Sequence, residues 1–498
     1  MDEKTGSETD RRTTAKSADK SANKRAKEMN TFYWYDLETS GTDPKWDRIV
    51  QFAGLRTDED LNVVGEEYCT YVHLPDDVLP NPDASLVTGI TPQLTHYKGI
   101  SETAALTEIN KIFSEPNTCV VGYNSLRFDD EFVRYGLYRN LMDPYAREWK
   151  NGNSRWDLLD LVRATGGLRR DGINWPEDED GLPVYKLEEL TKANGIEHGN
   201  AHDAMADVHA TVAMARLIKQ HQPRLFEYYF NLRQKKKVRA LLEPYGAQLC
   251  VHVSGIYPRV RSGVAPIISI GRHPTNGNSI LVVDLAEDVE PLLTMSPDEI
   301  AESLFKPNND KRPPVRELRI NRCPFVAPID VLAEENQKRL GIDLKLAKER
   351  ARRLRQPGIA DKLARVYMGQ QQTANVDVDT ALYDGFLQDG DRSRCEALHE
   401  ALRKGLWQEL DYDDKRLGKL ARRMKARSFT SLMEPEEFGP WRNFVTDKLR
   451  DEGDWLNLAK FEDRLQELMT DEFMSGERFT ILSQLAEHAA DLKLRYHL

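Results

Sequence analysis

The feature that most constrains the fold of this chain is a change of sequence pattern that occurs twice along it. Between residues 31 and 220, short apolar strands alternate with amphipathic helices, which is typical of an α/β domain with a mixed sheet. Between residues 249 and 323, short β-rich runs are separated by Gly, Pro and Asn, which predicts a small antiparallel barrel or sandwich. After residue 377, helical periodicity continues to the end. The pattern therefore predicts an α/β domain, a β-rich domain and an all-α domain in that order.

The length of the chain agrees with several domains, because 498 residues are too many for one hydrophobic core. Residues 1–30 contain almost no apolar side chains and cannot bury enough surface to offset chain entropy, so we expect a disordered N-terminal tail. The predicted domains then cover residues 31–215, 223–376 and 379–498.

The cysteines, the hydropathy and the charge of the chain limit the compartment and the classes of partner that we expect. The five cysteines are far apart and odd in number, which argues against a disulfide framework or a cysteine-based zinc site and fits a reducing cytoplasm. No run of about 18 apolar residues occurs, so no membrane partner is expected. The net charge of −11 is a weak argument against a polyanionic partner, since charges can segregate. Basic clusters lie at residues 233–239, 352–355 and 421–427, and each is also compatible with a solvated helix face.

The first apolar strand, Thr31–Leu37, carries one carboxylate near its end, Asp36, and is followed directly by a second, Glu38. Residues i and i+2 of a strand point to the same face, so these side chains project together. Adjacent carboxylates repel one another unless a proton or a cation lies between them, and hard oxygen donors favour Mg²⁺ or Mn²⁺. The stretch DLETSGTD also has the composition of a turn, so the pair alone does not establish a metal site.

Two later elements add to this pair. Asp129 and Asp130 follow another apolar strand where a helix is expected to begin, a position at which paired acids are often only caps. His202 lies in a loop, and Asp207 follows inside the next helix, for which Asp203 is a plausible cap. The order D-x-E, loop Asp, H-x4-D is much more specific than any of its parts. Such a set suits phosphodiester hydrolysis, in which two metal ions activate water and stabilise the leaving oxygen while a His acts as general base.

This order of residues resembles the His-containing (DEDDh) branch of the DEDD exonuclease superfamily. Longer stretches are similar to the bacterial exodeoxyribonuclease I family from about residue 32 to beyond residue 386, among them LVTGITPQ, GYNSLRFDDEF, NSRWDLLDLVRA, LTKANGIEHGNAHDAMADV and NVDVDTALYDGF. The resemblance implies a ribonuclease H-like α/β exonuclease domain, an SH3-like β domain and an all-α C-terminal domain. It also implies processive 3′-to-5′ hydrolysis of single-stranded DNA to 5′-mononucleotides, in DNA repair and recombination.

The resemblance also implies roles for the acidic residues. Asp36, Glu38 and Asp207 are expected to ligate a first metal ion, with Asp36 bridging to a second ion near Asp129. His202 is expected to be the general base. The expected cofactor is a pair of Mg²⁺ ions, with Mn²⁺ as a substitute.

DNA contacts are expected from basic and aromatic side chains, because single strands are held by basic grooves and stacking. Lys186 stands where the resemblance leads us to expect an Arg, and a lysine keeps the charge but loses the bidentate fork on phosphate. Tyr145 and Trp149 are also compatible with core positions. The full set of candidates is Arg134, Tyr145, Trp149, Arg163, Lys186 and Lys235.

The implied partners are single-stranded DNA and the single-stranded DNA-binding protein, whose acidic C-terminal tail would dock on a basic patch. Arg169 and Tyr228 are the candidates for that patch, and the chain is expected to be a monomer. An exoribonuclease of the same superfamily is an alternative that resembles only the first domain, and a polymerase proofreading subunit shares only the carboxylate order. The non-enzymatic alternative is a scaffold that binds single strands, against which the five filled catalytic positions argue.

Overall fold

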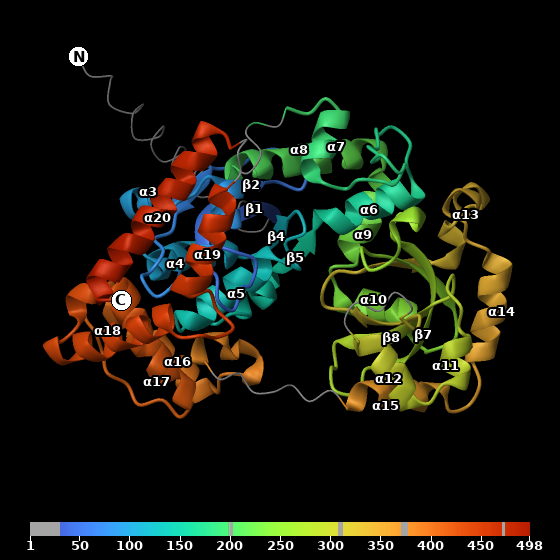
Figure 1. Cartoon of the computed structure of the whole chain (residues 1–498). Coiled ribbons are helices and arrows are strands. Elements are labelled where there is room, and N and C mark those ends of the chain that lie inside the picture. The colour runs from blue at the N-terminus through green and yellow to red at the C-terminus, as the bar shows by residue number, and fades with distance from the viewer. Residues whose placement is uncertain (1–29, 198, 200–202, 307–311, 370–376, 471–473) are drawn as a thin grey trace, which may run out of the picture. The chain divides into compact units, whose positions relative to one another are not determined.

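The computed structural model describes residues 30–197, 199, 203–306, 312–369, 377–470 and 474–498 (Figure 1). The expected disordered tail lies outside these residues, except for Asn30. The described residues form two compact units. One comprises the chain up to residue 121 with residues 132–154 and 386–498, and the other comprises residues 122–131 and 155–385.

The N-terminal sheet has five strands in the order β3-β2-β1-β4-β5. β1 pairs antiparallel with β2 and parallel with β4, so the sheet is mixed, as the sequence predicts. The position of β1 between two other strands explains the apolar run at the start of β1, where Trp34 is completely buried. The strands are β1 (Thr31–Thr39), β2 (Ile49–Thr57), β3 (Tyr68–Tyr71), β4 (Thr118–Gly122) and β5 (Ser154–Asp157).

The helices of the first 221 residues follow the predicted alternation with strands. Asp203 caps α8 as expected, since its carboxylate accepts the backbone N–H groups of Met205 and Ala206, both at 3.1 Å. Gly195 follows α7 with a φ of +65°, which glycine adopts without strain. The helices are α2 (Pro82–Thr88), α3 (Pro92–Lys98), α4 (Glu102–Phe113), α5 (Asp129–Arg139), α6 (Leu158–Leu168), α7 (Leu187–Ala193) and α8 (Ala204–His221), with 3₁₀ turns η1 (Ala146–Glu148) and η2 (Lys150–Gly152).

A second five-stranded sheet follows, in the order β10-β6-β7-β8-β9, with antiparallel pairing throughout. The predicted β-rich region is therefore a single antiparallel sheet extended by one strand beyond Cys323. Two helices precede it. These elements are α9 (Pro223–Asn231), α10 (Lys235–Leu242), β6 (Leu249–Val253), η3 (Arg259–Arg261), β7 (Val264–Arg272), β8 (Ser279–Asp284), β9 (Val315–Arg319) and β10 (Phe325–Pro328).

Helices complete the core of this second sheet. Leu292, Ile300 and Leu363 belong to three of these helices and share one buried cluster with Ile268 and Val283 of the sheet. The sequence predicts helices before residue 221 and after residue 377, and none of these five helices was among them. The helices are α11 (Glu290–Thr294), α12 (Pro297–Phe305), α13 (Glu334–Leu340), α14 (Leu344–Leu354) and α15 (Ile359–Met368), with η4 (Ile329–Val331) before α13.

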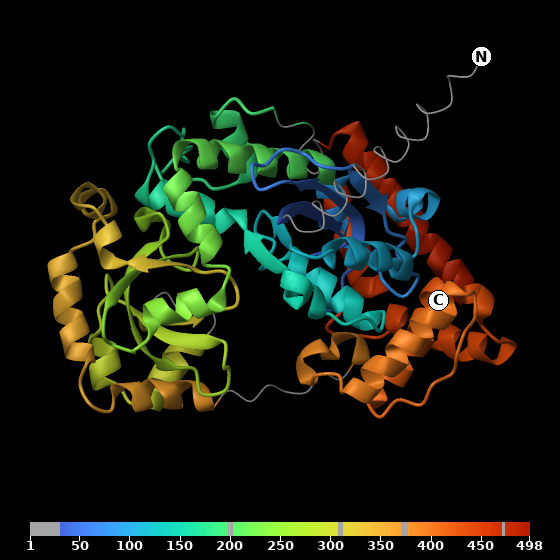
Figure 2. The same ribbon diagram turned by 180° about the vertical axis from the view of Figure 1, so that it is seen from behind.

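The C-terminal region is all-α, as predicted. Phe461, Leu482 and Leu485 pack in one buried cluster with Val445 and with Leu79 of the N-terminal region. Figures 1 and 2 both show α20 running beside α3, and the two helices are in contact. The elements are η5 (Val378–Asp384), α16 (Asp389–Arg403), α17 (Lys415–Ser428), η6 (Thr430–Leu432), α18 (Pro435–Arg450), α19 (Leu458–Met469) and α20 (Gly476–Tyr496). Among the described residues, none of the helices combines the length and the apolar character that a bilayer crossing requires.

Candidate active site

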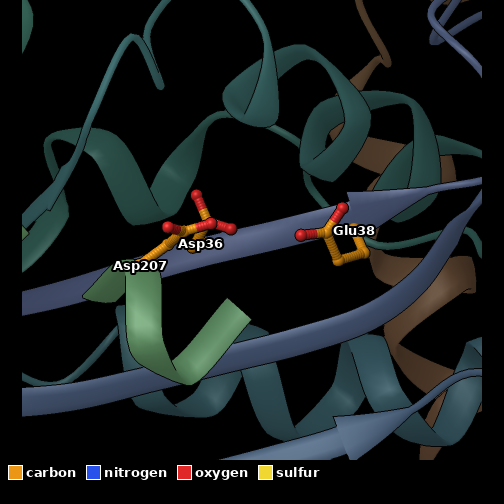
Figure 3. A group of neighbouring side chains, drawn as sticks. All are labelled: Asp36, Glu38 and Asp207. Carbon is orange, nitrogen blue, oxygen red and sulfur yellow. The ribbon is translucent and has the colours of Figure 1, made fainter. Parts of the chain in front are cut away.

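Three carboxylates come together where β1 meets the start of α8 (Figure 3). Asp36 and Glu38 project from β1, and Asp207 projects from the first turn of α8. One carboxylate oxygen from each residue lies within 4.8 Å of the others. Figure 3 shows Asp36 and Asp207 close together, with Glu38 further along the strand. Residues separated by about 170 positions in the sequence therefore form one acidic cluster.

The backbone explains how this cluster is built. Asp36 lies opposite Ala53 of β2 and Glu38 lies opposite Gln51, so the alternation of the strand places both carboxylates on one face. The pairing register shifts directly after Glu38. Asp207 is in the first turn of its helix, where the helix dipole favours a negative charge. Glu38 is buried, while Asp36 and Asp207 are half-buried.

The donor set of this cluster fits a hard divalent cation. All three side chains offer carboxylate oxygens, with no sulfur or imidazole among them. Three like charges held this close repel one another, and a cation between them removes that cost. Mg²⁺, Mn²⁺ and Ca²⁺ are the ions that prefer such ligands. The site is therefore suited to divalent metal binding.

Asp129, the fourth predicted carboxylate, is the first residue of α5 and is buried. In the described part of the chain it does not belong to the group of three oxygens within 4.8 Å. Its neighbour Asp130 forms an ion pair with Arg155. The next residue, Glu131, pairs with Arg322 at 2.7 Å and accepts the hydroxyl of Tyr383. Basic and phenolic partners therefore hold the other two acids of this helical turn.

The predicted general base, His202, lies outside the described residues. The helix that follows it begins at Ala204 and is fixed by the Asp203 cap.

Three of the DNA-binding candidates lie near one another in sequence and differ in exposure. The side chain of Trp149 is 68% exposed, so the alternative of a core position is wrong for this residue. Arg134 is buried, donates to Glu148 at 2.7 and 3.0 Å, and lies over the ring of Tyr145 at 5.5 Å. The half-buried Tyr145 ring contacts Phe386 at 5.8 Å between centroids. Phe386 is 78% exposed, and sequence reasoning missed it although its stretch carries part of the family resemblance.

The remaining DNA candidates are polar residues of the second unit. Lys186 is exposed directly before α7, and Lys235 is exposed as the first residue of α10. Arg163 donates to Asp160 at 3.0 Å. All three side chains carry positive charge, but only the two lysines are exposed.

The partner-site candidates make backbone contacts. Arg169 is exposed and donates to the carbonyl oxygens of Leu168 and Val331, at 2.6 and 3.2 Å. The hydroxyl of Tyr228 donates to the carbonyl oxygen of Val326 at 2.8 Å, and burial raises the pKa of this phenol to about 12. Tyr228 therefore has a structural contact of its own.

A buried carboxylate pair lies at the start of α6, and sequence reasoning missed it. Asp157 and Asp160 are both 1% exposed. Burial and repulsion from Asp160 raise the pKa of Asp157 to about 6, and Arg127 and two backbone N–H groups oppose this rise. The signal in the sequence is an Asp at each end of the short segment DLLD, within a stretch that resembles the family.

Three family models match consecutive parts of the chain. They are described as "Exonuclease" for residues 33–215, "Exonuclease I SH3-like domain" for residues 233–369 and "Exonuclease I C-terminal domain" for residues 376–492.

Relatives and solved structures agree with these models over nearly the whole chain. Exodeoxyribonuclease I of Haemophilus influenzae is 42% identical over 93% of this chain and 98% of its own length. The structure of Escherichia coli exonuclease I with a dA16 oligonucleotide is 40% identical, covers 93% of this chain and all of that chain, and gives a TM-score of 0.89. A zinc-bound form of the E. coli enzyme with single-stranded DNA, also 40% identical, covers 93% of this chain and 99% of that chain, with a TM-score of 0.88. The chain therefore belongs to the exodeoxyribonuclease I family, and it is an exonuclease.

Proposed function

We propose that the chain degrades single-stranded DNA processively from its 3′ end and releases 5′-mononucleotides, in DNA repair and recombination. The observation that carries the proposal is the convergence of Asp36, Glu38 and Asp207 within 4.8 Å in a domain of the exonuclease type. The E. coli relative that was solved with a dA16 oligonucleotide supports DNA as the substrate. The SH3-like and C-terminal domains support this activity over that of a single-domain exoribonuclease.

The proposed cofactor is Mg²⁺, for which Mn²⁺ can substitute. Asp36, Glu38 and Asp207 would hold one ion, and Asp36 and Asp129 would hold a second. The pairing of Asp130 with Arg155 supports Asp129, rather than its neighbour, as the metal ligand of α5. Divalent ions at these ligands supply the Lewis acidity that lowers the pKa of the attacking water and stabilises the departing 3′ oxygen.

The chain's own residues take part both in catalysis and in binding the strand. The carboxylates fix the ligand geometry, and His202 would remove the proton from the attacking water as general base. Trp149 and Phe386 are exposed aromatic side chains on which bases can stack, and the exposed Lys186 and Lys235 can contact phosphates.

Arg134 and Arg163 are tied to carboxylates, so their proposed part in DNA binding differs from that of the lysines. Arg134 lies over the Tyr145 ring and would hold it in position for stacking. Arg163 would present the part of its guanidinium that Asp160 does not use.

For the partner, we propose that the acidic tail of the single-stranded DNA-binding protein docks near Arg169 and Tyr228. Arg169 is exposed and carries the charge, while Tyr228 contributes ring surface because its hydroxyl donates to Val326. We also propose a monomer that acts in the cytoplasm, with domains at residues 31–215, 223–376 and 379–498.

The test of this function is a panel of substrates, each blocked at one end: single-stranded DNA, duplex DNA and RNA. We expect Mg²⁺-dependent release of mononucleotides from single-stranded DNA with a free 3′ end, and none in EDTA. Retention of the strand without release would instead indicate a binding scaffold, and preferred cleavage of the RNA would indicate an exoribonuclease. Affinity for the strand should fall steeply with salt, because phosphate contacts release counterions.

A further inference from the structure

A buried carboxylate lies behind the turn that leads from β4 into α5. Asp157 is the last residue of β5 and the N-cap of α6. We propose that Asp157 is a positioning residue that sets the shape of the turn at residues 124–128 and thereby the place of Asp129. This inference rests on the proposed function, in which Asp129 is a metal ligand.

The hydrogen bonds of Asp157 reach the turn directly. Its Oδ1 accepts the backbone N–H groups of Asn124 and of Leu159, both at 3.0 Å. Its Oδ2 accepts the backbone N–H of Leu126 at 3.2 Å. Two of these three donors belong to the turn, and only an ionised carboxylate offers two oxygens that both act purely as acceptors. The side chain therefore does more than cap its own helix.

The turn passes this constraint on to α5. Asn124 has a φ of +65°, a left-handed conformation that asparagine tolerates better than most residues. The backbone N–H of Asp130 donates to the carbonyl oxygen of Ser125 at 2.9 Å, so a hydrogen bond joins this turn to the first turn of the helix. A shift at Asn124 or Leu126 therefore moves the start of α5, where Asp129 is the first residue.

Asp160, one helical turn after Asp157, fixes the same turn through a side chain. Arg127 donates to Asp160 at 2.7 Å and lies 3.9 Å from Asp157. Asp160 also accepts from Arg163, which is a candidate for DNA contact. The two aspartates therefore differ in what they hold. Asp157 holds the turn before Asp129 and the start of its own helix, whereas Asp160 also aligns Arg163.

An ordinary N-cap elsewhere in the same unit gives a matched control. Asp343 caps α14 and accepts the backbone N–H groups of Lys345 and Leu346, at 2.8 and 3.1 Å. Both donors belong to its own helix. If Asp157 were only a cap, its loss would have the same kind of effect as the loss of Asp343.

The experiment compares Asp157→Ser and Asp157→Asn with Asp343→Ser in the full chain, on single-stranded DNA. Serine can still cap α6 but loses the second acceptor oxygen, while asparagine places an NH₂ group opposite the N–H of Leu126. We expect kcat to fall about 10- to 100-fold in both Asp157 variants, since small misplacements of catalytic groups cost rates of this order. KM for DNA should stay within about twofold, because ground-state binding is not removed. The metal concentration that gives half-maximal activity should rise.

Asp160→Asn should show the opposite split, raising KM for DNA more than it lowers kcat, and Asp343→Ser should leave both constants unchanged. A folded Asp157→Ser protein with kcat within about twofold of the parent would overturn the inference, since no transition-state interaction would then be lost. An equal loss of kcat in Asp343→Ser would overturn it as well.

If the Asp157 variants do not fold, hydrogen exchange of backbone amides in the unmodified protein tests the inference instead. The amides of Asn124 and Leu126 should be protected as strongly as those of Val120 and Val121 in β4, and rapid exchange at either would overturn the inference.

Asp129→Ala separates the two proposals. Full activity in that variant removes the role of Asp129 in the proposed function, whereas an inactive Asp129→Ala beside an active Asp157→Ser removes only the positioning role.

Discussion

The surroundings of Asp77 neutralise a buried negative charge, whereas the acidic cluster at β1 concentrates negative charge. Asp77 is 2% exposed and pairs with Arg427 at 2.7 Å and with Lys448 at 2.9 Å. At β1, by contrast, three carboxylate groups are gathered within 4.8 Å. The first arrangement neutralises a buried charge with cations from the protein and joins α17 and α18 to the N-terminal region. The second accumulates negative charge that favours a cation from solution.

The pKa of Asp77 reflects this neutralisation. Burial alone would raise the pKa, but Arg427 and Lys448 outweigh burial and hold the pKa well below its usual value. The basic cluster at residues 421–427 is therefore not simply a solvated helix face, because Arg427 and Lys425 are both tied to carboxylates. The comparison indicates that a paired buried acid marks a joint of the fold, whereas gathered acids mark a reactive site.

The largest expected effect breaks the acidic cluster. In Asp207→Ala, kcat on single-stranded DNA should fall by roughly a thousandfold or more, because a ligand needed for the transition state is lost. DNA binding should be largely retained, and thermal stability without metal should be equal or higher, since a like charge is removed. Kinetics and melting curves measured on the same preparation check both. A variant with parental kcat would contradict the role of the cluster.

The next effect breaks the Asp77 joint. Asp77→Asn removes the buried charge that pairs with both Arg427 and Lys448, and this kind of loss costs about 3–5 kcal/mol of unfolding free energy. The kcat of the folded fraction should be unchanged. Urea unfolding of the variant measures the loss.

Asp83→Asn is the matched control for this change, since Asp83 pairs with Arg464 but is much more exposed. Exposed pairs contribute little, so this variant should lose only a small fraction of the stability that Asp77→Asn loses. Equal losses in the two variants would show that burial does not distinguish the two ion pairs.

A third effect sharpens the comparison through metal binding. Mn²⁺ or Mg²⁺ at about 100 times its dissociation constant should raise the unfolding free energy of the parent protein by about 2.7 kcal/mol. The rise should be absent in Asp207→Ala and unchanged in Asp83→Asn. Melting temperatures measured with and without the ion provide the check, and an equal rise in Asp207→Ala would place the stabilising ion elsewhere.

The sequence predicts those parts of the site that follow from local periodicity. Asp36 and Glu38 share a face because strand side chains alternate, and Asp203 caps α8 because its carboxylate reaches the next N–H groups. The amphipathic pattern equally predicts α4 and the helices after residue 377. The change of pattern along the chain also predicts the order of the three domains, and the family resemblance adds their identity as exonuclease, SH3-like and C-terminal domains.

Other parts of the site depend on long-range contacts that no local pattern shows. Asp157 meets Asn124 across 33 positions, and Tyr383 reaches Glu131 across 252. The backbone contact of Tyr228 and the exposure of Phe386 likewise follow only from tertiary packing. Helices α11 to α15 were missed because the strand-like runs around them dominate the local pattern of the β-rich region.

The smallest effect concerns Asp157, whose environment is intermediate between that of the neutralised Asp77 and that of the acidic cluster. Backbone N–H groups donate to its carboxylate, while the neighbouring carboxylate of Asp160 repels it. Its pKa is raised from 3.8 to about 6, so between pH 6 and pH 4 the folded protein binds a proton that the unfolded chain does not yet bind. This group therefore makes the fold more stable as the pH falls through that window, and it costs stability above pH 6. The lowered pKa of Asp77 has the opposite effect on stability. Its contribution to the free energy of unfolding is complete above a pH of about 4 and is lost below it.

In Asp157→Asn the titrating group is absent. The unfolding free energy of the parent, relative to this variant, should therefore rise on going from pH 7 to pH 4.5, by about 1.4 kcal/mol for each unit of pKa difference that the window covers. Urea unfolding at the two pH values measures the change, with Asp343→Asn as the control that should track the parent. If the parent instead lost stability relative to Asp157→Asn over this range, the carboxylate would be held in its charged form like that of Asp77. The two buried aspartates would then belong to the same class.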